Sequence, residues 1–117
     1  MDADAVKARF NVVIDFSTAT KVLYVTTTIA HVSDQIYGEL LIKAHVVPEA
    51  TGKPHEHKLK SKYFDTTEFN TIKENFQFEV APSEMHFKSL ELFLYQKGLV
   101  KDDELARVNG MTNGRSD

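Results

Sequence analysis

Hydrophobic residues recur at every second position along most of this chain, and this spacing constrains the fold more than any other feature of the sequence. Phe10, Val12, Ile14 and Phe16 alternate along one segment, and the segment 75–80 repeats the pattern with aromatic residues. Successive side chains of a β-strand point to opposite faces of a sheet, so a period of two predicts strands with one buried face. No long segment carries the spacing of an amphipathic helix. The chain is therefore expected to be an all-β protein.

Six segments carry the strand signal, and turn-forming residues separate them. These segments are 10–16, 22–32, 39–47, 58–63, 75–80 and 90–95. The core faces are expected to hold Leu23, Val25, Ile29 and the weaker member Thr27, then Leu40, Ile42, Ala44 and Val46, then Phe76, Phe78 and Val80, and finally Leu90, Leu92 and Leu94. Short strands joined by turns predict an antiparallel sandwich or barrel.

The two ends of the chain lack this signal. Residues 1–8 are expected to form a flexible lead-in, residues 9–108 the folded domain and residues 109–117 a disordered tail. The stretch KDDELARVNG, residues 101–110, fits either a short helix or a loop with a stub of strand. At 117 residues the chain has the length of one domain with its own core.

Composition argues against several functional classes. The formal net charge of −3 argues against a general nucleic-acid binder, and the lack of cysteine excludes disulfides and a thiol nucleophile. No apolar stretch reaches membrane-spanning length, and no secretory signal is recognisable. Ser17, His31 and Asp34 are residue types of a hydrolytic triad, but no motif places them together. We expect a cytoplasmic, non-enzymatic domain without a cofactor and without nucleic acid as a partner.

Lysines recur at strand spacing in the middle of the chain. A period of two places Lys58, Lys60 and Lys62 on a single face, and Lys43 and Lys53 lie nearby in the sequence. Such a face would attract anionic membrane phospholipids or an acidic protein surface. The alternative is that alternating lysines only keep an outer strand soluble and protect it from pairing.

Three histidines lie near the same lysines. His45, His55 and His57 could meet across neighbouring strands and bind zinc, because imidazole is a common zinc ligand. Their spacing matches no strong metal motif, so we expect solvent-exposed histidines and no metal.

The order of these segments resembles the synaptotagmin-type C2 domain family. ARFNVVIDFSTATKVLYVTTTIAHV is similar to the opening hairpin of that family. GELLIKAHVVPE is similar to its lysine-bearing strand, with Lys43 at the lysine and Val47–Pro48 at the end of the strand. In the aromatic signature that follows the basic strand, Glu74, Phe76 and Phe78 fall on the family's glutamate and both aromatics. The resemblance covers most of the chain.

This resemblance implies an antiparallel Greek-key β-sandwich of about seven to eight strands. It also implies that the basic strand lies on a concave sheet face that meets acidic lipid headgroups or acidic protein surfaces. The implied function is a calcium-independent membrane-targeting or adaptor module of a trafficking or signalling protein, located in the cytoplasm or peripherally at membranes. The alternative is a protein–protein interaction domain without lipid affinity. A ligand-carrying barrel would need a deep polar pocket, for which nothing in the sequence argues.

Calcium sites of this family are built from aspartates in two loops, because a hard dication prefers several oxygen ligands. The corresponding positions in this chain are degenerate, and they hold Asp34, Glu39, Gln96, Gly98 and Glu104. Because Gln96 and Gly98 replace paired aspartates, the resemblance implies a member without tight calcium binding.

The end of the family's domain is also changed in this chain. Arg107 stands at the glycine near which the family's final strand begins, and only VNGMTNGRSD follows it. An unpaired sheet edge is costly unless it is covered or blunted. Three alternatives stay open: a reduced final strand, a truncated chain, or a sheet edge that is completed by a homo-oligomer or another partner.

Overall fold

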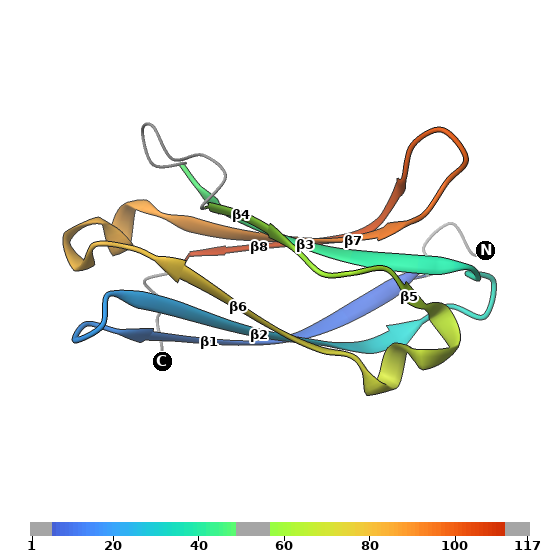
Figure 1. Cartoon of the computed structure of the whole chain (residues 1–117), viewed down its shortest axis with the longest axis horizontal. Helices are drawn as coiled ribbons and strands as arrows, with labels where there is room; N and C mark the ends of the chain where they lie inside the picture. The colour runs from blue at the N-terminus through green and yellow to red at the C-terminus, as the bar shows by residue number, and fades with distance from the viewer. Residues whose placement is uncertain (1–5, 49–56, 112–117) are drawn as a thin grey trace.

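The computed structural model describes residues 6–48 and 57–111, and within them two β-sheets pack face to face (Figure 1). Sheet A contains β1 (Ala8–Ser17), β2 (Val22–Val32) and β6 (Lys73–Glu79), in the order β1-β2-β6. Sheet B contains β3 (Glu39–Val47), β4 (Lys58–Lys60), β7 (Ser89–Gln96) and β8 (Asp103–Met111), in the order β4-β3-β7-β8. The short β5 (Phe64–Asp65) also pairs with β3, and every described pairing is antiparallel.

The connections between the sheets identify the fold class. The chain passes from sheet A to sheet B between β2 and β3, returns between β5 and β6, and crosses again between β6 and β7. Two 3₁₀ helices, η2 (Thr66–Thr71) and η3 (Pro82–Phe87), lie in the last two of these connections. Neighbouring strands that are distant in sequence, such as β2 with β6, are typical of Greek-key sandwiches. The predicted antiparallel β-sandwich is confirmed, with eight strands in the described residues.

The core lies between the two sheets and is built by the alternate residues that the period of two predicts. Buried side chains from sheet A are Leu23, Val25, Thr27, Ile29, Phe76 and Phe78, and those from sheet B are Leu40, Ile42, Ala44, Val46, Leu90, Leu92 and Leu94. The hydroxyl of Thr27 is fully buried, and no hydrogen-bond partner for it lies among the described residues. Ile14 is 39% exposed because β1 lies at the edge of sheet A. The inward face of β1 is thus less covered than the alternation suggests.

Strand β8 settles the alternative that the sequence left open for residues 101–110. The segment forms neither a helix nor a stub, because β8 pairs with β7 from Gln96–Asp103 to Ser89–Met111. Residues 109–111, which the sequence interpretation assigned to the tail, belong to this strand. Likewise, β1 begins at Ala8, the last residue of the expected lead-in.

The chain leaves regular strand geometry immediately after β4. Ser61 Oγ accepts a hydrogen bond from the Ile42 amide (2.9 Å) and donates one to the Lys62 carbonyl (2.8 Å). Between the pairs Lys43–Lys60 and Leu40–Phe64, three steps along β3 are matched by four steps along the partner segment. This extra residue interrupts the alternation that the sequence extends from residue 58 to residue 63.

Candidate functional site

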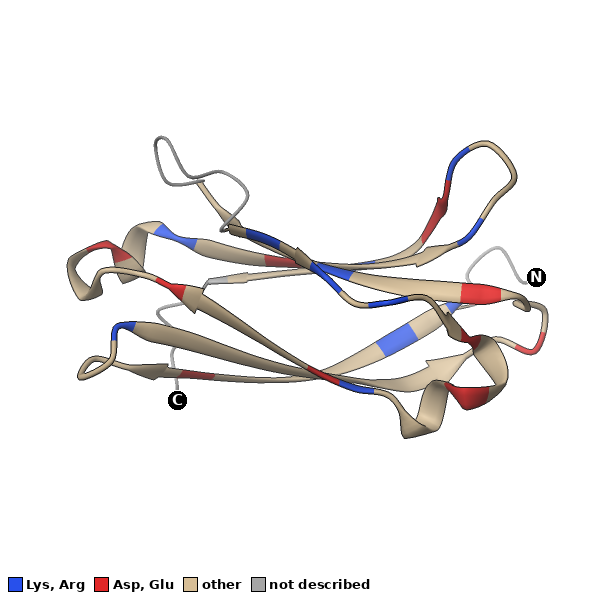
Figure 2. Ribbon diagram, viewed as in Figure 1, with Lys and Arg blue, Asp and Glu red and all other residues tan. Residues whose placement is uncertain are grey.

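Outward-facing side chains of sheet B form a row of cations that crosses four strands. Lys60 of β4 lies opposite Lys43 of β3, Lys43 lies opposite Phe93 of β7, and Phe93 lies opposite Arg107 of β8. Residues directly opposite in an antiparallel ladder share one face of the sheet. Figure 2 shows the lysine and arginine positions gathered on β4 and the adjoining part of β3.

A neighbouring row continues this surface. Lys58 lies opposite His45, and His45 lies opposite Glu91. We call the surface that these two rows and Tyr95 form the basic face; its members are Lys43, His45, Lys58, Lys60, Glu91, Phe93, Tyr95 and Arg107. Lys43, His45, Lys58 and Lys60, together with Leu59, also line a shallow hollow of about 250 Å³. This volume is below the usual ~300–1,000 Å³ of small-molecule pockets, so it suits a phosphate-sized group better than an enclosed substrate.

Two cations of the basic face, Lys43 and Arg107, lie over aromatic rings. The Lys43 ammonium lies 4.8 Å from the ring centre of Tyr95, and the Arg107 guanidinium carbon lies 4.8 Å from that of Phe93. The rings of His45 and Phe93 are 5.1 Å apart, and those of Phe93 and Tyr95 are 6.0 Å apart. Burial is the main cause that raises the pKa of the Tyr95 hydroxyl. Cation–π contacts therefore fix positive charge over a rigid aromatic floor.

Two lysines of the basic face occupy directly opposite positions on neighbouring strands. Lys43 and Lys60 face each other directly, and like charges in such a pair destabilise a sheet. Arg107 is partly compensated, because its Nη2 lies 3.0 Å from Glu104 Oε1 and this hydrogen bond raises the pKa of the guanidinium. An anion bound between the lysines would relieve their repulsion.

The structure brings together only part of the predicted lysine set. Lys43, Lys58 and Lys60 share the basic face as the period of two predicts. Lys62 lies beyond β4, in the segment where the extra residue interrupts the alternation, so it does not continue the strand. Lys53 and His55 lie outside the described residues. His57 is buried, which contradicts the expectation of an exposed histidine, and His45 is half-buried against Phe93.

Sequence reasoning missed the contributions of Phe93, Tyr95 and Arg107. The signal was present in β7, where Leu90, Leu92 and Leu94 fill the core and the alternate positions still carry two aromatics. Arg107 could be placed only after its strand was known.

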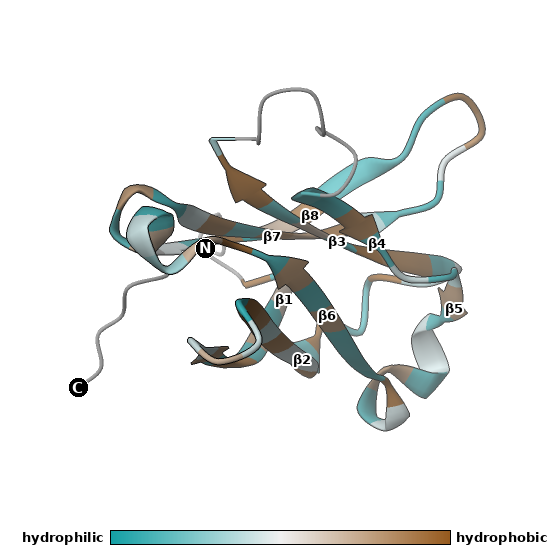
Figure 3. Cartoon of the chain, turned by 60° about the vertical axis from the view of Figure 1, so that its left-hand side comes forward, coloured by the Kyte–Doolittle hydropathy of each residue, from teal (hydrophilic) through white to brown (hydrophobic). Residues whose placement is uncertain are grey.

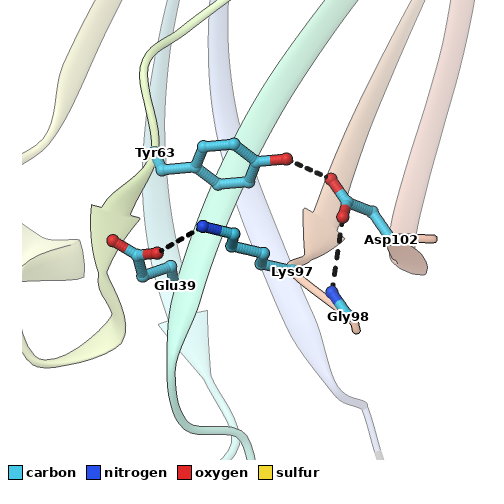
Figure 4. Close-up of polar contacts among 5 residues, drawn as sticks. All are labelled: Glu39, Tyr63, Lys97, Gly98 and Asp102. Atoms are coloured by element: carbon cyan, nitrogen blue, oxygen red, sulfur yellow. Dashed lines mark hydrogen bonds and ion pairs between the residues drawn. The ribbon is translucent and has the colours of Figure 1, made fainter. Parts of the chain in front are cut away.

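A second polar cluster fixes the loop between β7 and β8 (Figure 4). The Tyr63 hydroxyl donates a hydrogen bond to Asp102 Oδ2 (2.6 Å), and the Gly98 amide donates one to Asp102 Oδ1 (3.3 Å). The Tyr63 bond is the main cause that lowers the pKa of Asp102, and it raises the pKa of Tyr63. Lys97 Nζ lies 3.3 Å from Glu39 Oε1 and 5.0 Å from the ring centre of Tyr63. The base of the loop is thus held by side chains of this chain.

Of the five positions that the sequence analysis matched to calcium ligands, only three come together. Glu39, Gln96 and Gly98 line one hollow of about 480 Å³ together with Lys97. Asp34 lies in a different hollow beside η2, and Glu104 is paired with Arg107. Among residues 6–48 and 57–111, no group of three or more His, Asp or Glu side chains is placed to bind a metal ion. Gln96 Nε2 instead donates a hydrogen bond to the Tyr37 carbonyl (2.7 Å).

The tip of the same loop is apolar and fully exposed. Leu99 is 106% exposed and Val100 is 98% exposed, and Lys97 and Lys101 flank them. Figure 3 shows the apolar colour at the tip of the loop between β7 and β8. Nothing in the described residues covers these two side chains.

The arrangement of the two sheets defines a C2-like β-sandwich module. The third C2 domain of the KIAA1228 protein, solved in solution, superposes with a TM-score of 0.66 at 12% sequence identity, covering 96% of this chain and 82% of that domain. At this identity the likeness shows the fold. No protein-family model and no curated protein matches the sequence. In the described part of the chain, no helix has the length and apolar character needed to span a bilayer.

Proposed function

We propose that this chain is a calcium-independent, synaptotagmin-type C2 module that places a trafficking or signalling protein at membranes from the cytoplasm. The module is non-enzymatic and binds anionic phospholipid through the basic face. One observation carries the proposal: Lys43 and Lys60 lie directly opposite each other, in the same row as Arg107. Their repulsion is relieved when a phosphate group binds between them.

The expected affinity is modest and depends on salt. Each lysine close to an anionic membrane contributes about 1 kcal/mol, so three lysines give weak attachment that ionic strength screens. The exposed Leu99 and Val100 add apolar contact if binding through the basic face also places the loop tip in the lipid interface.

Two features of the loop base support calcium independence. The Lys97 ammonium lies beside Glu39, so a positive charge of the chain already occupies the region where a cation would have to bind. A Cβ at position 98 would collide with the carbonyl oxygen of Lys101, so this loop conformation leaves no room for an aspartate there. Both features disfavour a bound cation at the loop base.

The alternative is a protein–protein interaction domain without lipid affinity. An acidic protein surface would satisfy the same cations, and the exposed edge of β1 favours contact with another protein chain. Lipid-binding measurements separate the two functions.

Co-sedimentation with vesicles tests the proposal. The wild type is compared with Lys58→Gln/Lys60→Gln and with a control, Lys7→Gln/Lys73→Gln, which removes the same charge outside the basic face. With phosphatidylserine vesicles at low salt, the first variant should lose about thirtyfold in affinity and the control little. Equal binding with calcium or chelator is expected. Equal losses in both variants, or binding only with calcium, would contradict the proposal; no binding at all would favour the protein-interaction alternative.

A further inference from the structure

The two edges of sheet A differ in how they are protected. At the β6 edge, Lys73, Glu74 and Glu79 place charges along the strand, while the inward Phe76 and Phe78 are buried. Charged side chains are a common device against unwanted strand pairing. This edge is therefore blunted.

The β1 edge carries fewer charges for its length, and Arg9 and Asp15 are the charged residues of this strand. β1 is ten residues long, it pairs with β2 along its whole length, and no other described strand pairs with it. Val13 is 65% exposed and Ile14 is 39% exposed, while Phe10, Val12 and Phe16 are only half-buried. A long, apolar, unpaired edge offers backbone hydrogen bonds and apolar contact to an added strand.

The sequence of β1 is complementary to itself when it is reversed. If two copies of β1 pair antiparallel about Val12, Arg9 of one copy lies opposite Asp15 of the other, and the reverse pair forms by symmetry. On the inner face, Phe10 lies opposite Ile14 of the second copy, and Val12 lies opposite Val12. Arg9 and Asp15 are both exposed and on the outer face of sheet A.

We propose that the occupant of this edge is a second copy of the chain, in the register that pairs Arg9 with Asp15. The two copies of sheet A then form one continuous sheet around a two-fold axis perpendicular to it. Such an axis leaves the direction of each sheet's outer face unchanged, so both basic faces point to the same side. Two basic faces on one particle would bind a membrane with higher avidity than one. The gain in membrane avidity rests on the proposed function, whereas the dimer itself does not.

Charge reversal tests the register without lipid. Arg9→Glu sets a carboxylate opposite Asp15 in both cross-strand pairs, and Asp15→Arg sets a guanidinium opposite Arg9 in both. We expect each variant to raise the dimer dissociation constant about tenfold or more in analytical ultracentrifugation. A mixture of the two variants should associate again, because each unlike pair is then attractive. Lys7→Glu is the control, because it makes the same charge change at a position that lies opposite the uncharged Ser17 in this register. This variant should dimerise with the same dissociation constant as the wild type.

Several results would overturn the inference. A wild type that stays monomeric up to millimolar concentration would overturn it. Normal dimerisation of Arg9→Glu and Asp15→Arg would also overturn it, and so would a Lys7→Glu variant that loses dimerisation to the same extent as Arg9→Glu. A monomer in which the β1 amides that point away from β2 are protected from hydrogen exchange would assign the edge to another segment of the same chain. Because the readout needs no membrane, failure of the dimer and failure of lipid binding are distinguishable. Circular dichroism melting curves confirm that each variant is folded.

Discussion

The two sheets share one core but turn very different faces to solvent. On sheet A, Thr26 and Thr28 of β2 stand beside Asn75 and Lys73 of β6, and Thr26 Oγ1 donates a hydrogen bond to Asn75 Oδ1 (2.8 Å). On sheet B, Lys43 and Arg107 lie over aromatic rings, and Lys60 lies opposite Lys43. The inward alternation determines the fold, whereas the outward residues distinguish a binding surface from a solvated one.

The largest expected effect comes from breaking the core that both sheets share. Phe78 belongs to sheet A and is fully buried against sheet B. Phe78→Ala should lower the free energy of unfolding by about 3–5 kcal/mol, because it removes apolar contact and leaves a cavity. Urea unfolding followed by circular dichroism should show one cooperative transition, with lipid binding lost at the same midpoint. If the basic face kept its affinity for lipid after sheet A had unfolded, the two sheets would not form one cooperative folding unit.

Arg107 tests whether the basic face extends beyond the lysines that the sequence indicated. Arg107→Gln should reduce affinity for phosphatidylserine vesicles about fivefold, because one cation near the membrane is lost. Arg107→Lys keeps the charge but not the planar stacking on Phe93, and its affinity should lie between those of the wild type and Arg107→Gln. Surface plasmon resonance on captured vesicles measures both. An Arg107→Gln affinity equal to that of the wild type would confine the contact to β3 and β4.

A change inside sheet A should alter stability without altering the basic face. The buried Thr27 hydroxyl has no partner among the described residues, so Thr27→Val replaces an unsatisfied polar group with a methyl group. We expect the free energy of unfolding to rise by about 1 kcal/mol. Thermal unfolding should move to higher temperature while vesicle affinity stays unchanged. A lower melting temperature would mean that the hydroxyl is hydrogen-bonded.

The smallest expected effect concerns the loop that joins β7 to β8. Because the folded-state pKa of Asp102 is lowered, its hydrogen bonds stabilise the loop above the ordinary Asp pKa and are lost as the pH falls below about 4. The Gly98 amide resonance should therefore shift only in acid, and Asp102→Asn should abolish that titration. A Gly98 shift that titrated near neutral pH would point to another group.

The sequence predicted most of the fold because the core depends on a local pattern. Each of the six segments that the sequence indicated has one apolar face, and a period of two is readable without knowing the neighbours; the two-residue β5 is too short to show such a pattern. Strand β8 was not predicted from the sequence. Its pairing register with β7 shifts between Leu94 and Tyr95, and the adjacent residues Leu105 and Ala106 both pack against the core. Two adjacent inward residues hide the alternation.

The candidate site was less predictable, because it depends on which strands become neighbours. Lys58 and Lys60 were readable from spacing within one strand. Arg107 is brought to them through Phe93 on an intervening strand, and only the sheet order β4-β3-β7-β8 shows this. The Tyr63–Asp102 bond joins residues 39 positions apart and has no local signal.

The most direct test of the account is to ask which face of the sandwich touches the membrane. Amide signals of the isotope-labelled protein would be recorded with phosphatidylserine nanodiscs that carry a gadolinium-labelled lipid, in the presence of chelator. We expect strong broadening at Lys43, Lys58, Lys60 and Arg107, with the signals of Thr26, Thr28 and Asn75 retained. Equal broadening on both sheets, or stronger broadening on sheet A, would contradict the assignment of the basic face as the membrane contact.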